Sequence, residues 1–593
     1  MPSLVKKTIS GRPYYYLVWS GRVNGKPRTV RQVYLGPAEV VAQRLAGQLD
    51  PQFAPQGSYA IRREFGASTA LWSLAERIGL VDLIDSVVPS QHRNALTTGQ
   101  YLTLAAINRC VAPISKKRMA QWHGASYVST LLPATAKALQ GQRFWDAMNE
   151  VSEQHIQEVE EKLLTRVHEV VGLDVSRVVF DATNFFTFID TRTPGKLAQR
   201  GHNKAKRDDL RQVSVSLLVA LDFAIPLFHD CYAGNVADSK EFAAALQPMV
   251  RRMQALNMKP EEVTVAFDKG NNSEENFKRL NACGFHFVGS LSPSQHADLA
   301  QVPLEQFSEL TGGRLAGLRV FRRTKTVFGA KRTVVVTWNP RLAAGQEAAL
   351  LTRLYKKTTA LREVQERLLR LPQRPANLRK RTTVSTVTRE VNEILSNKEV
   401  RRCIEVRIAE EGGLPSLEFE PNNGAISELK SQIYGKNIVF TDHEEWSTED
   451  IILAYRSQYK LERQFRNMKD HHGLCWWPQF HWTDQKIRVH ALYCVIGLLL
   501  LSLLQRQLAQ DKMIIPIPRL IQQLRDIEEI TQVVVGGAAG HAATSITTTL
   551  TKLNQEQHAL FESLGLARFV PKNVLGTTSA KRRQRHQTRT QRA

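Results

Sequence analysis

Three acidic residues stand out because of their positions in the sequence. Asp181 follows the apolar run at residues 178–180, and Asp268 follows a second apolar run at residues 263–267. Glu462 comes much later, in a segment with helical spacing. Carboxylates at the tips of two strands, with a third on a helix, suit a site in which two divalent cations cut phosphodiester bonds. Because Mg²⁺ prefers carboxylate oxygens, we expect two Mg²⁺ ions, for which Mn²⁺ can substitute.

The segment around Glu462 is predicted to be a helix with several polar side chains on one face. At about 100° per residue, the face combines this carboxylate with basic and hydrogen-bonding groups: Tyr455, Gln458, Glu462 and Lys469, with Arg466 beside them. The alternative is a solvated amphipathic face with a few charges. That alternative does not explain the aromatic residues on the same side, so the functional interpretation is favoured.

Composition restricts the partner of this chain. A length of 593 residues with 42% hydrophobic residues predicts several folded domains. The formal net charge of +24 predicts a polyanionic partner, either nucleic acid or an anionic membrane, although a generally adhesive basic protein is an alternative. The longest apolar run, residues 491–504, is shorter than the roughly 20 residues of a membrane span. We therefore interpret it as a buried core helix and expect nucleic acid, not a membrane.

The cysteine pattern and the first residues of the chain indicate a cytoplasmic protein. The six cysteines are scattered and include no CxxC pair, which argues against a zinc site and against a disulfide framework. The first residues, Met1 to Lys7, contain no apolar signal-peptide core. We expect reduced thiols in such a compartment.

Hydrophobic periodicity predicts an α/β order around the two aspartates. Strands are expected at residues 176–181, 213–222, 225–233, 263–268 and 285–290, with a helix at 239–253 between the third and fourth. Further strands are expected at 318–323, 331–338 and 437–441, interrupted by a charged helix at 345–371.

The N-terminal part shows two different patterns. Residues 14–35 read as a β-hairpin, because Asn24-Gly25 is a strong type I′ turn signal between two strand-like runs. Residues 60–170 have helical spacing, with helices expected at 69–78, 101–110 and 144–170. Ser68 is a plausible N-cap of the first of these helices and Gly79 its stop.

Taken as an ordered set, these motifs resemble a bacterial insertion-sequence transposase of the DDE type. The resemblance is to the group with a Tyr-(2)-Arg-(3)-Glu-(6)-Lys signature, which here is Tyr455, Gln458, Glu462 and Lys469. The spacing matches, but Gln458 stands where the group usually has arginine, so Arg456 or Arg466 would have to supply the phosphate contact of that arginine. The segments around Asp181, Asp268 and residues 478–484 also fit, and the resemblance covers roughly residues 170–510.

This resemblance implies an RNase H-like catalytic core with a β-rich insertion. Asp181, Asp268 and Glu462 would hold two Mg²⁺, water would cut the element end, and the freed 3′-OH would attack target DNA. Tyr455 and Lys469 would hold the phosphate near the scissile bond. Arg200 and Lys204 would hold the DNA backbone close to Asp181, although a basic surface loop is an equal alternative.

The resemblance also implies partners and leaves one step of the route open. The partners would be double-stranded DNA and a second copy of the chain in a synaptic complex. Some members of the group pass through a DNA hairpin with a flipped base stacked on an aromatic ring. Trp338, Trp446 and Trp482 are candidates for that ring, but each is more easily explained as a core residue.

These patterns predict six parts of an α/β protein. They are a basic N-terminal β-hairpin region at 1–60, a helical DNA-binding module at 61–170, the first part of an RNase H-like core at 171–299, a β-rich insertion with one long helix at 300–440, the second part of the core at 441–515, and a C-terminal helical region with a basic tail at 516–593.

Two other functions remain as alternatives. One is an RNase H-like nuclease that cuts DNA without joining it, and the other is a domesticated DNA-binding protein without catalysis. The second alternative predicts a broken carboxylate set, whereas all three acids are present in this chain.

Overall fold

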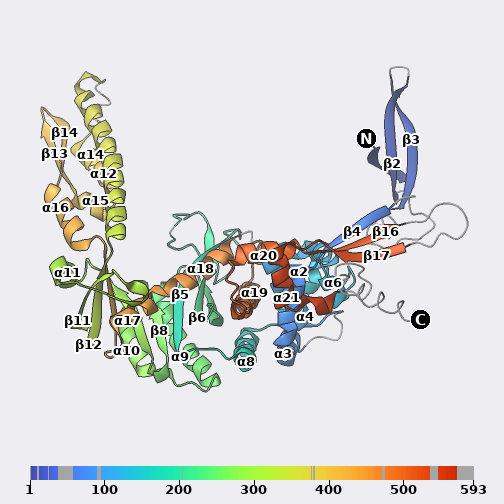
Figure 1. Ribbon diagram of the computed structural model, residues 1–593. Helices are drawn as coiled ribbons and strands as arrows, with labels where there is room; N and C mark the ends of the chain where they lie inside the picture. The colour runs from blue at the N-terminus through green and yellow to red at the C-terminus, as the bar shows by residue number, and fades with distance from the viewer. Residues whose placement is uncertain are drawn as a thin grey trace, which may run out of the picture. The chain divides into compact units, whose positions relative to one another are not determined.

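The computed structural model describes residues 2–9, 12–23, 26–37, 58–89, 95–203, 205–375, 377, 381–470, 474–534 and 545–570. The chain divides into two compact units (Figure 1). Unit 1 comprises Met1–Val159, Asn467–His481 and Arg488–Ala593, and unit 2 comprises Glu160–Arg466 and Trp482–Ile487. The predicted Asn24-Gly25 turn, Lys204 and the basic C-terminal tail lie outside the described residues.

Unit 2 is built on a mixed sheet of nine strands in the order β10-β11-β12-β15-β9-β8-β5-β6-β7. Strand β8 runs parallel to both of its neighbours, β5 and β9, and every other pair in the sheet is antiparallel. The strands are β5 (Arg177–Thr187), β6 (Arg211–Ala220), β7 (Pro226–Ala233), β8 (Thr264–Phe267), β9 (His286–Leu291), β10 (Ser308–Glu309), β11 (Arg319–Val327), β12 (Ala330–Trp338) and β15 (Lys436–Thr441). The runs expected from the sequence are found with small shifts at their ends, except that β5 continues to Thr187 and β11 to Val327.

Helices cover both faces of this sheet. On one face lie α9 (Asp238–Ala255) and α10 (Glu274–Cys283), where Phe242 of α9 contacts Phe180 and Phe267 with ring centroids 5.2 and 4.7 Å apart. On the other face lies α17 (Thr448–Arg456), whose Ile451 and Ile452 share a core with valines of β9 and β15. Because side chains alternate along a strand, residues next to Phe180 and Phe267 face the α17 side.

The 300–440 region differs from the predicted β-rich insertion. Its strands β10, β11 and β12 extend the main sheet, and β12 pairs with β15. The segment that leaves the sheet lies between β12 and β15 and has its own hydrophobic core. It is mainly helical and consists of α12 (Pro340–Leu369), α14 (Val384–Ile394), α15 (Lys398–Arg402), β13 (Ile404–Glu411), β14 (Leu414–Pro421) and α16 (Asn423–Glu428). We call residues 340–434 the hairpin module, because they connect β12 to β15, two adjacent antiparallel strands that pair like the strands of a β-hairpin.

Unit 1 contains two small antiparallel sheets. The predicted hairpin is present as β2 (Arg12–Val23) and β3 (Lys26–Pro37), but β1 (Pro2–Ile9) adds a third strand that the sequence pattern did not reveal. The other sheet, in the order β17-β16-β4, joins β4 (Ser58–Glu64) to β16 (Glu528–Val534) and β17 (Ser545–Leu550). Sequence analysis did not predict β4 or β16, because their pairing joins residues more than 400 positions apart.

Helices make up most of the rest of unit 1, and two predictions about them are corrected. Ser68 is buried within α2 (Gly66–Arg77), and Glu64 caps that helix instead by accepting the Ala67 N–H at 2.7 Å. The single helix expected at 144–170 is two helices, α7 (Gly141–Asn149) and α8 (Glu153–Val171), separated at residues 150–152. The helices are α2 (Gly66–Arg77), α3 (Leu80–Val87), α4 (Thr98–Val111), α5 (Met119–Gly124), α6 (Val128–Leu131), α7 (Gly141–Asn149), α8 (Glu153–Val171), α19 (Asp484–Gln510), α20 (Ile517–Arg525) and α21 (Gln555–Ser563), of which α8 and α19 have residues in both units.

The apolar run near residue 500 forms a core helix, as predicted. It lies in α19, the one described helix that is long and apolar enough to cross a membrane. Its most apolar 18-residue window is 94% buried inside the protein. Burial of this extent is what a core helix requires, because its apolar surface is already covered by protein.

Candidate functional site

The structure places Asp181 and Asp268 on neighbouring strands. Phe180 of β5 is the parallel partner of Phe267 of β8, and each aspartate is the next residue along its strand direction. Adjacent strands lie about 4.8 Å apart, so the two aspartates start from adjacent backbone positions. Both follow a phenylalanine that faces α9, and both therefore face the α17 side of the sheet.

The setting of Asp181 differs from the strand tip expected from the sequence. Strand β5 continues to Thr187, whereas β8 ends at Phe267. Asp181 thus lies within a strand, at the level where its parallel neighbour stops. The apolar run ended at the aspartate because the following residues of β5 are less buried, not because the strand ended.

The backbone orients both aspartate side chains. Asp181 Oδ1 accepts the Ala182 N–H at 2.8 Å, and Asp268 Oδ1 accepts the Lys269 N–H at 2.8 Å. The second contact makes Asp268 the N-cap of a short 3₁₀ turn, Lys269–Asn271. Asp268 is exposed and Asp181 is partly buried.

The predicted helix around Glu462 is two helices. Helix α17 ends at Arg456, and α18 (Gln458–Lys469) begins after a one-residue break at Ser457. Tyr455 therefore lies on α17, whereas the other members of the predicted face remain together on α18. The Ser457 hydroxyl donates to the Ala454 carbonyl at 2.5 Å, which satisfies that carbonyl at the break.

Tyr455 connects this helix pair to the end of the sheet. Burial raises the pKa of the Tyr455 hydroxyl, a hydrogen bond with Ser290 of β9 lowers it, and the negative charges of Asp268 and Glu462 raise it further. These charges act on Tyr455 only because both carboxylates lie in its neighbourhood. The structure therefore brings Tyr455, Asp268 and Glu462 to one region of unit 2.

The other predicted DNA-contacting residues have different settings. Arg466 and Lys469 are exposed on α18. The Gln458 side-chain amide nitrogen is buried and has no hydrogen-bond partner among the described residues. Arg200 is exposed and donates from Nη2 to the Thr191 hydroxyl at 3.4 Å. Lys204 cannot be placed, because it lies outside the described residues.

The loop that carries Arg200 is fixed to the sheet by Gln212 of β6. The side-chain Nε2 of Gln212 donates to the carbonyls of Gly234 at 2.7 Å and His202 at 3.1 Å. Asp484, at the start of α19, accepts the N–H groups of Lys196 at 2.7 Å and Leu197 at 3.1 Å. Sequence analysis did not assign these anchoring roles to Gln212 and Asp484, because no sequence motif links either residue to the backbone groups that it contacts.

The three tryptophans considered for base stacking are not equivalent. Trp446 stacks on the His443 ring at 3.9 Å, and Trp338 has the Arg319 guanidinium 5.5 Å from its ring centroid. Both are partly buried, whereas Trp482 is 66% exposed.

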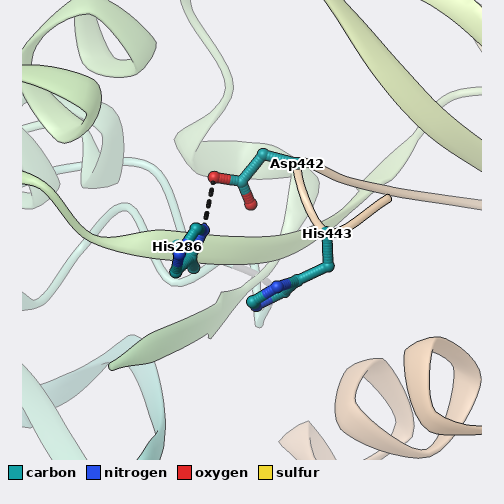
Figure 2. Close-up of side chains that lie close together, drawn as sticks. All are labelled: His286, Asp442 and His443. Atoms are coloured by element: carbon teal, nitrogen blue, oxygen red, sulfur yellow. Dashed lines mark hydrogen bonds and ion pairs between the residues drawn. The ribbon is translucent and has the colours of Figure 1, made fainter. Parts of the chain in front are cut away.

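A second group of chemically active side chains was missed by sequence analysis. His286, Asp442 and His443 offer candidate ligand atoms that all lie within 4.8 Å of one another (Figure 2). Asp181, Asp268 and Glu462 are not part of this group. Burial and the neighbouring His286 lower the pKa of the His443 imidazole to about 4, although Asp442 opposes this shift. The histidines are far apart in the sequence, so no spacing motif indicates the group.

The fold and its paired carboxylates define an α/β protein with acidic side chains gathered beside one face of a large sheet. Residues 177–496, a little over half of the chain, match the family described as the transposase DDE domain. The chain therefore belongs to the transposase DDE domain family, whose members are DNA-processing enzymes.

Among solved structures, the chain is similar to the piggyBac transposase in a synaptic complex with hairpin DNA. The similarity covers 89% of this chain and 90% of that chain, with 7% sequence identity and a TM-score of 0.34. A similarity this distant gives no residue-level information about the site. None of the curated proteins matches the sequence.

Proposed function

We propose that this protein is a DNA transposase that cuts insertion-sequence ends and joins the freed 3′-OH ends to target DNA. The proposed metal-holding and catalytic residues are Asp181, Asp268 and Glu462. The observation that carries this proposal is the position of the two aspartates, each directly after one member of the in-register Phe180–Phe267 pair, together with the influence of Asp268 and Glu462 on Tyr455.

The strand order supports an RNase H-like core. Strands β7, β6 and β5 form an antiparallel meander, and β8 and β9 continue the sheet parallel to β5. Asp181 lies within β5 and Asp268 directly follows β8, on the face covered by α17, whereas Glu462 lies on α18. This arrangement agrees with the catalytic core implied by the sequence resemblance.

The donor set fits two Mg²⁺ ions, because all three predicted ligands offer hard carboxylate oxygens. When bound, the ions would activate the attacking oxygen and stabilise charge on the leaving oxygen. The chain itself fixes one oxygen of each aspartate through a backbone N–H, which orients the carboxylates. Tyr455, Arg466 and Lys469 would bind the phosphate beside the scissile bond.

Several narrower features belong to the same proposal. The Tyr-Gln-Glu-Lys spacing supports membership of the bacterial signature group, in which Gln458 would stand in the position usually held by arginine; its side-chain nitrogen is buried. Arg200 and Lys204 would bind the DNA backbone.

A homodimer would pair two DNA ends, and the protein would act in the cytoplasm on nucleoid DNA. The six domain boundaries given above remain predictions.

Strand-transfer assays test the reaction. Full-length protein, terminal DNA and Mg²⁺ should give nicked ends, and pre-cleaved ends should give joined products. Asp181→Asn, Asp268→Asn and Glu462→Gln should each abolish both products, because each removes a carboxylate charge from the site. Glu445→Gln, at an exposed acid ahead of α17, is the matched control and should retain activity.

The possible products separate the proposal from its alternatives. Nicking without joined products would identify a nuclease, and end binding without any cleavage would identify a DNA-binding protein. Binding by the three acid variants should stay close to wild type. Because the net charge is +24, affinity should also fall steeply with added salt as bound counterions are released.

A further inference from the structure

A compact group of two histidines and one aspartate lies at the other end of the central strands from Asp268. His286 is the first residue of β9, and Asp442 and His443 follow β15 directly. Thr264, the parallel partner of His286, begins β8, whereas Asp268 follows the last residue of β8. Four residue spacings separate Thr264 from Asp268, which corresponds to about 13 Å along a strand. The group is therefore distinct from the proposed catalytic carboxylates.

The spacing of the group suits a metal ion. His286 Nδ1 and Asp442 Oδ2 lie 3.0 Å apart, and the candidate ligand atoms of all three residues lie within 4.8 Å of one another. Two ligands at about 2.1 Å from a zinc-type ion lie about 3.0–3.5 Å apart. The ligand atoms of His286 and Asp442 already have this separation. A small side-chain movement would bring the ligand atom of His443 to the same distance from both.

Surrounding contacts hold the three side chains in place. Asp442 Oδ1 accepts the Phe287 N–H at 3.0 Å, and His443 Nε2 is hydrogen-bonded to the Thr264 hydroxyl at 2.8 Å. The His443 ring is stacked on Trp446 at 3.9 Å and lies 4.3 Å from the His286 ring. Outer contacts of this kind fix the orientation of metal-binding imidazoles and carboxylates.

We propose that His286, Asp442 and His443 bind one divalent transition metal ion of the zinc type. Two imidazoles and one carboxylate favour such an ion over Mg²⁺, which prefers an all-oxygen set. Binding would tie the start of β9 to the segment that leads from β15 into α17, the helix that carries Tyr455. The absence of a CxxC pair argued against a zinc site in the sequence, but that pattern does not report on histidine and aspartate ligands.

Two neighbouring guanidinium groups oppose metal binding. Arg177 acts on His443 and lies 5.0 Å from the centroid of the Trp446 ring. Arg332 Nη1 lies 4.0 Å from Asp442 Oδ2, and its guanidinium also bonds to Asn281 at 3.2 Å. A cation bound by Asp442 would be repelled by this guanidinium. Replacing Arg332 by a neutral residue should therefore tighten metal binding, whereas replacing a ligand should weaken it. These opposite effects on affinity distinguish the proposed site from nonspecific metal binding to the protein surface.

The test is a titration of the full-length, metal-stripped protein with Zn²⁺ in an excess of Mg²⁺, which competes for the proposed carboxylate site. We expect one Zn²⁺ per chain with an affinity that falls at least about tenfold in His286→Ala, His443→Ala and Asp442→Asn. Arg332→Gln should raise the affinity. Co²⁺ should give the visible absorption of a nitrogen- and oxygen-ligated ion, and that absorption should be lost in the ligand variants.

Controls separate this site from the proposed function. Asp268→Asn should leave Zn²⁺ binding in excess Mg²⁺ unchanged, and His558→Ala, at an exposed histidine of α21, should also bind as wild type. Circular dichroism must show that the ligand variants fold. The proposal is overturned if folded ligand variants bind Zn²⁺ as tightly as wild type, or if wild type binds none, whatever the DNA assays show.

Discussion

At the scale of single residues, the Tyr455 hydroxyl links two parts of the proposed site. It is hydrogen-bonded to Ser290 of β9, and the charges of Asp268 and Glu462 act on it. A hydroxyl held in this position can donate to a phosphate oxygen between the carboxylates. The Ser290 contact would then orient the donor and would not itself touch the substrate.

We predict that Tyr455→Phe slows DNA cleavage by about 10²-fold, the cost typical of removing one positioned donor. The ring remains, so the melting temperature should change little. Ser290→Ala should slow cleavage less, and combining both changes should add nothing to Tyr455→Phe, because the two residues act through one hydroxyl. Single-turnover cleavage rates measure all three variants. Equal rates for Tyr455→Phe and wild type would remove the hydroxyl from the site.

Glu64 provides a residue-scale prediction about pH. Burial raises the pKa of its carboxyl to about 7, although hydrogen bonds from Ser68 and Ala67 oppose the shift. The folded state therefore binds a proton more tightly than the unfolded chain does. The free energy of unfolding should fall as pH rises from about 4.5 to about 7, and the loss should persist above pH 7.

Glu64→Gln should remove this pH dependence, because the amide keeps an acceptor for the start of α2 but carries no charge. Relative to wild type, the variant should be more stable at pH 8 by roughly 3 kcal/mol and nearly equal at pH 4. Thermal unfolding of both proteins at each pH gives the difference between their free energies of unfolding. Because all other titrating groups are the same in both proteins, their contributions cancel in this difference. A stability difference that does not change with pH would contradict the raised pKa.

At the scale of elements, the loop of Arg200 depends on close backbone contact. A Cβ at Gly234 would lie 2.1 Å from the Gln212 carbonyl oxygen, and a Cβ at Gly201 would lie 2.1 Å from the Gly234 carbonyl oxygen. Only glycine allows these segments to approach so closely. The same approach lets the Gln212 side chain reach the carbonyls of Gly234 and His202.

Gly234→Ala should therefore destabilise unit 2 by about 3 kcal/mol or more, since a rigid backbone atom must move. It should also weaken DNA binding through the displaced loop. Gly345→Ala is the matched control: it lies in α12 with open space around it and should be neutral or stabilising by up to about 1 kcal/mol. Denaturant unfolding of both variants measures the effects. Wild-type stability for Gly234→Ala would show that the backbone contact is not tight.

Sequence periodicity predicted the elements that depend on local pattern. Apolar runs located β5 to β9 and assigned Asp181 and Asp268 to the first and fourth of them, but only the structure shows that these two strands are neighbours. The break at Ser457 was missed, because helical spacing continues across it. Strand β4 was missed because its partner lies near the other end of the chain. The group around His443 was missed because its members meet only through the pairing of β9 with β15.

At the scale of the whole molecule, the hairpin module occupies the place of a turn. Trp338, the last residue of β12, is the antiparallel partner of Lys436, the first residue of β15. Just beyond them, the Asn339 N–H donates to the Gly435 carbonyl at 2.9 Å. The intervening residues form a core of their own, separate from the core between α17 and the sheet. The sheet thus has the geometry of a hairpin whose turn was replaced by 340–434.

Deleting residues 340–434 joins Asn339 directly to Gly435, and Asn-Gly is the preferred two-residue type I′ hairpin turn. We predict that the shortened protein folds, keeps the nine-stranded sheet and melts within a few degrees of wild type. Circular dichroism and thermal unfolding test this, and DNA binding and cleavage by the same protein then show what the module contributes. As a matched control, Gly435→Val in the shortened chain should destabilise it, because a β-branched residue is strained at the positive φ that this turn requires. An unfolded shortened chain would mean that the module is part of the folding unit and not an addition to a hairpin.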